Sequence, residues 1–382
     1  MNLWQQLIGQ DRAIEQLTLA AAQDRPSHAW LFSGQPGVGV PQAALTFATA
    51  LLCQQEDPAA RACGICPACQ SVQAGSHPDL VHFVTEKTTI SIEEARDLVV
   101  KAQDRPSLGR WRIILLEDAD RMPERTSNVL LKAIEEPPPY TIWLLTTPSP
   151  AQVLITIRSR CRAVPLATPR PQQVAAYLQT QLGLSPEAAD LTARLAQGNL
   201  DVARQLASDP DARQRRTQVV SLPLTLRNLP AAMDAADRLI SIAEAQAEAD
   251  AQARNQADRE ALLRALGYEE GDKLTPTHRA QVRQLEEDQK RRAKRIQTDT
   301  LDRFLSDLQT LLRDVLTLQV GSGSELINLH LADQITAYAQ QKSPQQTLEL
   351  LETLKLTRRR IQGNVSPRLA FEALMASFLP SS

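Results

Sequence analysis

Four of the five cysteines lie within one short segment near the N-terminal end of the chain. Their pattern is C-x9-C-x2-C-x2-C, and its members are Cys53, Cys63, Cys66 and Cys69. Four thiolates suit a tetrahedral zinc ion, with Zn–S bonds of about 2.3 Å. A ferredoxin-type iron–sulfur run would continue x3-C-P, and this chain does not. The pattern therefore favours structural zinc over an iron–sulfur cluster or unligated thiols, and four protein ligands argue against a catalytic metal.

A glycine-rich stretch before the cysteines resembles a phosphate-binding loop. It reads GQPGVGVP, with glycines at Gly34, Gly37 and Gly39. Loops of the form G-x-x-x-x-G-K-[ST] hold phosphates on backbone N–H groups, and they add a lysine and a hydroxyl that binds Mg²⁺. Val40 and Pro41 stand at the lysine and hydroxyl positions here. Losing a charge-assisted contact costs about 1.5–3 kcal/mol. Taken alone, the stretch is better explained as an ordinary tight turn.

A pair of carboxylates follows the apolar run Ile113–Leu116. Glu117-Asp118 resembles the strand-end pair that places a metal-binding Asp and then a catalytic Glu beside a phosphate loop. The order is inverted here, so the first side chain is one methylene longer than in that pair and the second is one methylene shorter. A solvated acidic strand end explains the two residues almost as well.

These residues need alternating strands and helices to hold them in place. Apolar runs predict strands at His28–Ser33, Trp111–Asp118 and Thr141–Thr147. Helical patterns follow the glycine loop and recur at Arg125–Glu136, between the second and third strands. Strands that alternate with helices imply a parallel sheet covered on both faces. We therefore predict an α/β domain at residues 1–166, with a zinc module inserted at about 53–69.

Strand signals largely disappear after about residue 165. A capping serine and a proline begin a helix at Ser185, and Gly198 is placed to end it. These signals predict a small helical domain at 167–215. One apolar stripe runs through Leu301–Leu316, which predicts a helical packing domain at 216–382. Within it, the charged segment at about 245–295 is expected to form exposed, paired helices.

Composition limits the possible functions. The chain has 382 residues and a formal net charge of -2, which excludes a strongly basic polyanion-binding protein. Neither a membrane-spanning apolar run nor a signal-peptide pattern is evident, so we expect a cytoplasmic protein whose clustered thiols bind metal. Basic runs at 290–295 and 358–360 lack interleaved aromatic residues, which favours solvated helix faces or subunit contacts over nucleic-acid binding. No serine, histidine and aspartate pattern suggests hydrolytic catalysis.

The motifs occur in the order found in clamp-loader AAA+ proteins. They are LIGQDRAIEQL, HAWLFSGQPGVG, LLEDADRM, SNVLLKAIEEPP, LLTT and RSRC, between residues 7 and 161. The chain therefore resembles the AAA+ clamp-loader subunits of the bacterial DNA polymerase III holoenzyme, over nearly its whole length. The resemblance implies an AAA+ module, a helical lid and a C-terminal collar. The stretch Gln362–Met375 resembles the tail of that collar. A zinc module at this position also matches that family.

The resemblance implies a role for several residues. Thr147 and its neighbour Thr146 stand where the family senses the γ-phosphate, and Ser159-Arg160-Cys161 matches its short signature. Arg160 would be an arginine finger for the ATP of a neighbouring subunit, and such fingers are worth about 10³–10⁵ in rate. Asp201 replaces the second sensor arginine of active relatives. Cys161 is expected to be a packing residue.

Most of the departures from the family pattern fall on the chain's own ATP chemistry. We therefore expect a non-catalytic subunit that does not bind ATP but completes the ATP site of a neighbour during DNA replication. The implied partners are ATPase subunits and a delta-type subunit in a hetero-pentamer, with the sliding clamp and primed DNA reached through the complex. An active DNA-dependent ATPase, such as a clamp-loader motor or helicase loader, is the alternative. A zinc-dependent nucleic-acid-binding regulator has the least support from composition.

Overall fold

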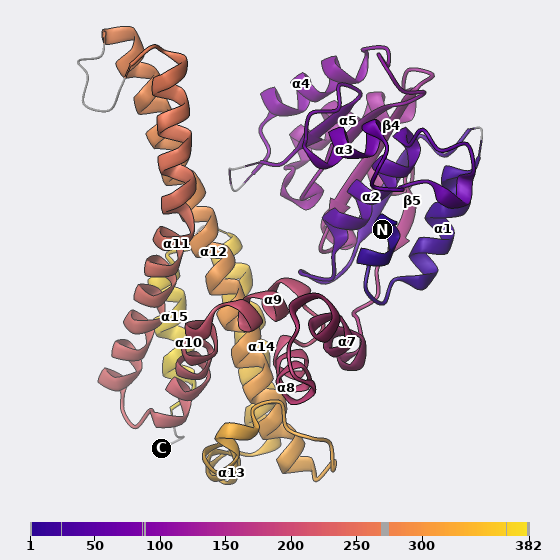
Figure 1. Ribbon diagram of the computed structural model, residues 1–382. Coiled ribbons are helices and arrows are strands. Elements are labelled where there is room, and N and C mark those ends of the chain that lie inside the picture. Colours follow the sequence, from indigo (N-terminus) through magenta and orange to yellow (C-terminus); the bar gives the residue numbers. More distant parts are fainter. Residues whose placement is uncertain are drawn as a thin grey trace. The chain divides into compact units, whose positions relative to one another are not determined.

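The computed structural model describes residues 2–23, 25–85, 87, 89–268, 275–363 and 365–379 (Figure 1). The chain forms two compact units, Met1–Ser208 and Asp209–Ser382. Each unit has its own hydrophobic core. Among the described residues, no helix has both the length and the hydropathy needed to cross a lipid bilayer.

The first unit is built on a five-stranded parallel sheet in the order β2-β3-β4-β1-β5. The strands are β1 (Ala29–Ser33), β2 (Leu80–Phe83), β3 (Arg112–Leu116), β4 (Thr141–Thr147) and β5 (Arg162–Pro165). The parallel sheet predicted from the sequence is thus confirmed, with β1, β3 and β4 at the predicted places. The sequence did not indicate β2 and β5. These are the two edge strands, and each has only four residues, several of them partly or fully exposed.

Helices cover both faces of the sheet. Alternate residues of β3 show the arrangement: Ile113 and Leu115 pack in the core that holds α1 and α2, whereas Ile114 and Leu116 pack in the core that holds α4 and α5. This alternation follows from the period-two geometry of a strand. The helices of this unit are α1 (Asp11–Ala21), α2 (Val40–Leu52), α3 (Pro67–Gln73), α4 (Ile92–Ala102), α5 (Glu124–Glu135), α6 (Ile155–Arg158), α7 (Pro171–Leu182), α8 (Pro186–Ala196) and α9 (Leu200–Ser208).

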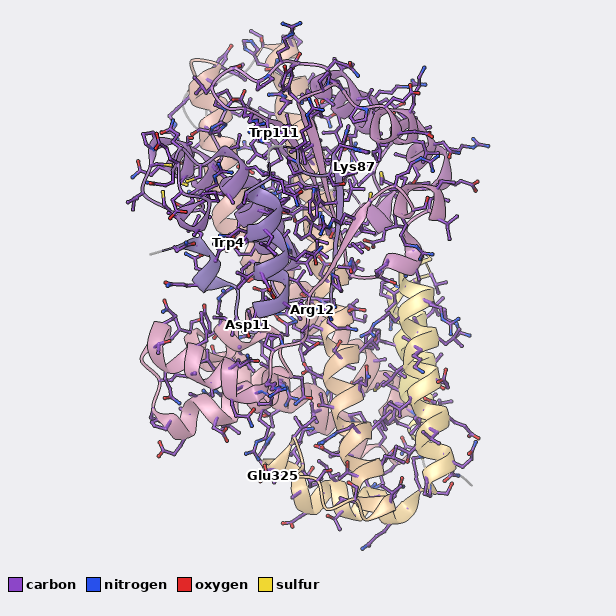
Figure 2. All side chains as sticks on the ribbon, turned by 90° about the vertical axis from the view of Figure 1, so that its right-hand side faces the viewer. Trp4, Asp11, Arg12, Lys87, Trp111 and Glu325 are labelled. Atoms are coloured by element: carbon purple, nitrogen blue, oxygen red, sulfur yellow. The ribbon has the colours of Figure 1, made fainter. Side chains whose placement is uncertain are left out.

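The N-terminal segment joins one of these layers. Asp11 and Arg12 begin α1, and Trp4 lies in the short turn before it (Figure 2). Trp4 is buried in the core that also holds α2. The acidic side chain in the first turn of α1 is favourable because it lies at the positive end of the helix dipole.

Helices α7, α8 and α9 form a small core of their own within the first unit. The predicted start of α8 is confirmed, because the Ser185 side chain accepts a hydrogen bond from the Ala188 N–H. Gly198 has a φ of +82°, which favours glycine, and it separates α8 from α9. The segment between β5 and α7 is tied to the N-terminal region by Gln10, whose side chain makes two hydrogen bonds with the Ala167 backbone. Separate core and lid domains, divided at residue 166, remain a prediction.

The second unit is helical in its described residues. It contains α10 (Pro210–Ser221), α11 (Leu229–Ala265), α12 (Pro276–Val320), α13 (Ala332–Gln341), α14 (Pro344–Gln362) and α15 (Pro367–Ser377). The stripe at Leu301–Leu316 lies in α12, and most of its apolar side chains are buried in the core of the unit. Helix α14 begins with a capping box formed by Ser343 and Gln346.

Helices α11 and α12 run antiparallel as a long pair (Figure 1). Within the charged segment at 245–295, residues 245–265 and 276–295 belong to this pair, and residues 269–274 lie outside the described range. Buried alanines at 243, 247 and 251 let the helices approach closely. Arg292 of the basic run bonds to Asp258 at 2.7 Å, and Arg291 pairs with Glu287. These charges are therefore engaged within the helix pair.

Candidate functional site

The four cysteines converge on one point. Cys53 follows α2, Cys66 caps the start of α3 and Cys69 lies within α3. The Sγ atoms lie within 4.8 Å of one another, with 3.8 Å from Cys53 to Cys63, 3.9 Å from Cys53 to Cys66 and 3.8 Å from Cys63 to Cys69. A tetrahedral ion with Zn–S bonds of 2.3 Å requires S···S separations of about 3.8 Å. The cluster therefore fits a metal ion such as zinc.

Backbone N–H groups near the cysteines point at two of the sulfur atoms and stabilise their thiolate forms. The Cys66 N–H points to Cys63 Sγ at 3.4 Å, and the Cys69 N–H points to Cys66 Sγ at 3.4 Å. Burial raises the pKa of the Cys63 thiol, but the N–H groups of Ile65 and Cys66 outweigh it and lower the pKa to about 6. Burial raises the pKa of Cys69. A bound cation would favour the thiolate form at every ligand.

The glycine loop has the strand–loop–helix geometry of a phosphate loop. It joins β1 to α2, and β1 lies between β4 and β5 in the sheet, at the kind of position where α/β proteins bind ligands. Gly37 and Gly39 have φ values of +79° and +90°, and Gly39 caps α2. Val40 is the first residue of α2 and is buried in the core beneath the loop. An active phosphate loop would have a lysine at this position. Here the position adds an apolar side chain to the core instead.

The start of α9 lies directly against this loop. The Leu200 N–H donates to the Gly37 carbonyl at 2.7 Å. A Cβ added to Gly37 would meet Asn199 Oδ1 at 1.9 Å, so the Asn199 amide is packed on the glycine backbone. Asn199 Oδ1 also caps α9 by accepting from the N–H groups of Asp201 and Val202. Asp201 itself is exposed and pairs with Arg204 on the same helix.

The carboxylates after β3 are held by partners within the chain. Glu117 pairs with His82 of β2 at 2.7 Å, and Asp118 pairs with Arg121 at 3.2 Å. The third carboxylate, Asp120, accepts a hydrogen bond from the Thr147 hydroxyl at 2.9 Å. Burial raises the pKa of Asp120. Sequence reasoning missed both His82 and Asp120, since a contact across strands leaves no local pattern.

Thr146 also has an internal role, because its hydroxyl accepts a hydrogen bond from the Asp118 N–H at 3.3 Å. The loop after β1, the carboxylates after β3 and the threonines that end β4 all lie at the carboxyl ends of parallel strands. The structure thus brings these predicted site residues to one edge of the sheet.

Arg160 lies on the connection between α6 and β5. Its Nη2 donates to Glu135 Oε1 at 2.8 Å, and its Nη1 donates to the Thr156 carbonyl at 2.9 Å. Arg160 precedes β5, so it lies near the amino ends of the strands, at the edge opposite the glycine loop. Cys161 packs against the core beside α4 and α5, and burial raises its pKa to about 12. The Arg160–Glu135 pair was not indicated by the sequence.

Comparison with known proteins gives consistent matches. A family model described as DNA polymerase III, delta subunit, matches residues 9–170, and the model of its C-terminal part matches residues 256–379. The delta' subunit of DNA polymerase III from Escherichia coli K12 is 33% identical over 205 residues, 53% of this chain and 61% of that protein. The delta' subunit from Pseudomonas aeruginosa is 37% identical over 51% of this chain and 60% of that protein.

The tau subunit from E. coli K12 is 31% identical over 272 residues, 69% of this chain and 41% of that protein. The chain thus spans less than two thirds of the length of these relatives. A solved gamma-subunit-related protein from Thermotoga maritima is 14% identical over 96% of this chain and 98% of that chain, with a TM-score of 0.44.

The strand order, the helices on both faces and the loop after β1 define an AAA+-like protein with a mostly helical C-terminal region. The matched models and these relatives are described as DNA polymerase III subunits, and this chain is similar to them in both its N-terminal and its C-terminal part.

Proposed function

We propose that this chain is a delta'-type, non-catalytic subunit of the DNA polymerase III clamp loader. In this role it takes part in loading the sliding clamp onto primed DNA and supplies Arg160 to ATP bound by a neighbouring subunit. The main support is that its own loop has lost the lysine, while Arg160 is intact and partly exposed at the opposite edge of the sheet.

The loop observations support the loss of ATP hydrolysis. Val40 is buried, and Pro41 removes one N–H from the first turn of α2. Asn199 is packed on Gly37, beside the backbone that would hold a phosphate. Glu117 and Asp118 are paired with His82 and Arg121. Several features needed for Mg²⁺–ATP are therefore replaced or engaged elsewhere.

The position of Arg160 supports a role in trans. A residue that lies before β5 and a loop that follows β1 are at opposite ends of parallel strands, so Arg160 is far from the chain's own loop. An ATP that Arg160 contacts must then be held by another subunit. Such an arginine acts by stabilising charge that develops on the transferred phosphoryl group.

The other assignments follow from the same role. Residues 1–166 form the AAA+ core, residues 167–215 form the lid, and residues 216–382 form the collar that joins the other clamp-loader subunits. Cys53, Cys63, Cys66 and Cys69 hold a structural zinc ion that fixes the segment between α2 and α3.

The experiment is an ATPase assay of the assembled clamp loader with Arg160→Ala, beside Arg160→Lys. We expect the complex to assemble normally and its ATP turnover to fall by tenfold or more, on the scale of known arginine fingers, which reach about 10³–10⁵. Lysine keeps the charge but not the planar fork, so it should restore little of the rate. Normal turnover in an assembled Arg160→Ala complex would show that the proposed role is wrong.

An active tau-type ATPase is the second candidate, because the tau relative aligns with 69% of this chain. Equilibrium binding of labelled ATP to the isolated chain separates the two. A delta'-type chain should show no Mg²⁺-dependent binding in the micromolar range, whereas an active subunit should bind ATP in that range.

A further inference from the structure

Arg160 has a counterion within its own chain. Glu135 is the last residue of α5, and its Oε1 lies 2.8 Å from Arg160 Nη2. The Thr156 carbonyl of α6 accepts from Nη1 at 2.9 Å. Both terminal nitrogens of the guanidinium are therefore engaged. The Arg160 side chain is 35% exposed and the Glu135 side chain is 53% exposed, so a partner can reach the pair.

A carboxylate and a phosphate compete for the same donors. The guanidinium fork binds either group through two parallel N–H bonds. A γ-phosphate that took both terminal nitrogens would have to displace Glu135, or else lie beside its negative charge. Either outcome weakens the contact between Arg160 and the phosphate.

We propose that Glu135 restrains Arg160 and competes with the γ-phosphate of the neighbouring subunit's ATP for its guanidinium. This inference rests on the proposed function of Arg160. Glu135 is then a positioning residue that sets how readily the neighbour's site closes on ATP. Exposed ion pairs of this kind change an equilibrium by up to about fivefold.

The test is Glu135→Gln in the assembled clamp loader, measured by steady-state ATP hydrolysis. We expect KM for ATP to fall by about two- to fivefold with kcat unchanged, because the cost of displacing Glu135 arises when ATP binds and is the same in the ground state and in the transition state. The matched control is Glu136→Gln, the next residue, which is also exposed. Glu136→Gln removes the same charge from the adjacent position and should leave KM unchanged.

The double variant Glu135→Gln/Arg160→Ala shows whether Glu135 acts through Arg160. In the Arg160→Ala background, Glu135→Gln should have no effect on KM, since the residue it competes for is gone. An effect that persists there, or equal effects of Glu135→Gln and Glu136→Gln, would point to general charge and overturn the inference. An increase in KM would also overturn it.

These outcomes are separate from a failure of the proposed function. If Arg160→Ala lowers turnover and Glu135→Gln has no effect, only the competition is wrong. If Arg160→Ala leaves turnover normal, both the arginine-finger role and the inference are wrong.

Discussion

At the scale of single residues, a buried carboxylate away from the glycine loop holds a connection of the first unit. Asp79 is fully buried and accepts hydrogen bonds from the N–H groups of Ser107, Leu108 and Gly109. Burial raises the pKa of Asp79, but these three N–H groups outweigh it and lower the pKa. The carboxylate thus fixes the segment between α4 and β3, which leads into the centre of the sheet.

Replacing Asp79 should make stability less dependent on pH. A carboxylate with a lowered pKa in the folded state stabilises the protein above its unfolded pKa of about 3.9, and this contribution is lost as the pH falls through the folded value. Asp79→Asn leaves a weaker acceptor, so we expect a loss of about 1–3 kcal/mol in the free energy of unfolding at pH 7. Urea unfolding at pH 7 and at acid pH measures this. The difference in the free energy of unfolding between wild type and Asp79→Asn should become smaller at acid pH.

The control for this change is Asp104→Asn. Asp104 pairs with Arg112 but is 63% exposed, so its loss should change the free energy of unfolding by less than about 1 kcal/mol. An equal gap between wild type and Asp79→Asn at both pH values would mean that the ionised carboxylate is not the stabilising form.

At the scale of elements, the cysteine cluster lies in a segment where Ala62 is the one buried residue between Cys53 and Cys66. Between α2 and α3 the chain has only one short helical turn, Pro58–Ala60, whose residues include no buried side chain. Ala62 and Gly64 adopt positive φ values beside Cys63. A bound ion would tie this irregular segment to both flanking helices, as structural zinc does in small domains.

Removing a ligand should therefore remove the metal and loosen this segment. For Cys66→Ser we expect the zinc content to fall well below one ion per chain and Tm to fall with it, because binding and folding of the segment are coupled. Metal analysis of purified protein with thermal unfolding measures both. Cys161→Ser is the control, since Cys161 packs in the core away from the cluster and should leave the zinc content unchanged. Full zinc content in Cys66→Ser would contradict the four-cysteine site.

The elements also show which structure the sequence could predict. Strands β1, β3 and β4 are buried along their whole length, so they appear as continuous apolar runs. The edge strands β2 and β5 are short and mixed in polarity, and nothing distinguished them from loops. The cysteines were found because a metal site imposes a local spacing. The pairs Arg160–Glu135 and Thr147–Asp120 join distant segments, so only the folded chain shows them.

At the scale of the whole molecule, the second unit has the means to fold by itself. Its core joins side chains of α10 to α15. A buried polar network adds to it: Arg216 of α10 bonds to Asp307 at 2.8 Å and to Asn328 at 2.8 Å, and Asn328 is bonded to buried Asp314. These contacts connect α10, α12 and the segment before α13 within one unit.

The fragment Asp209–Ser382 should therefore fold and carry the assembly function without the ATPase function. We expect cooperative, highly helical unfolding, and assembly with the other clamp-loader subunits into a complex with low ATP turnover. Circular dichroism and size-exclusion chromatography of the reconstituted complex measure this. Arg216→Ala should destabilise the fragment by about 3–5 kcal/mol, because it removes the arginine that is hydrogen-bonded to the largely buried Asp307. A folded fragment that fails to join the complex would argue against the collar assignment.

Arg160 and the glycine loop lie at opposite ends of the parallel strands, so the two ends of the sheet would meet different neighbours in an assembly. A ring of head-to-tail contacts needs every member to offer a finger at one edge and an occupied nucleotide site at the other. In the proposed role, this chain offers the first and lacks the second. A series of ATP-mediated contacts between neighbouring subunits can thus begin at this chain but cannot continue beyond it. A single copy is then enough to form one end of the series and to keep the ring open beside it.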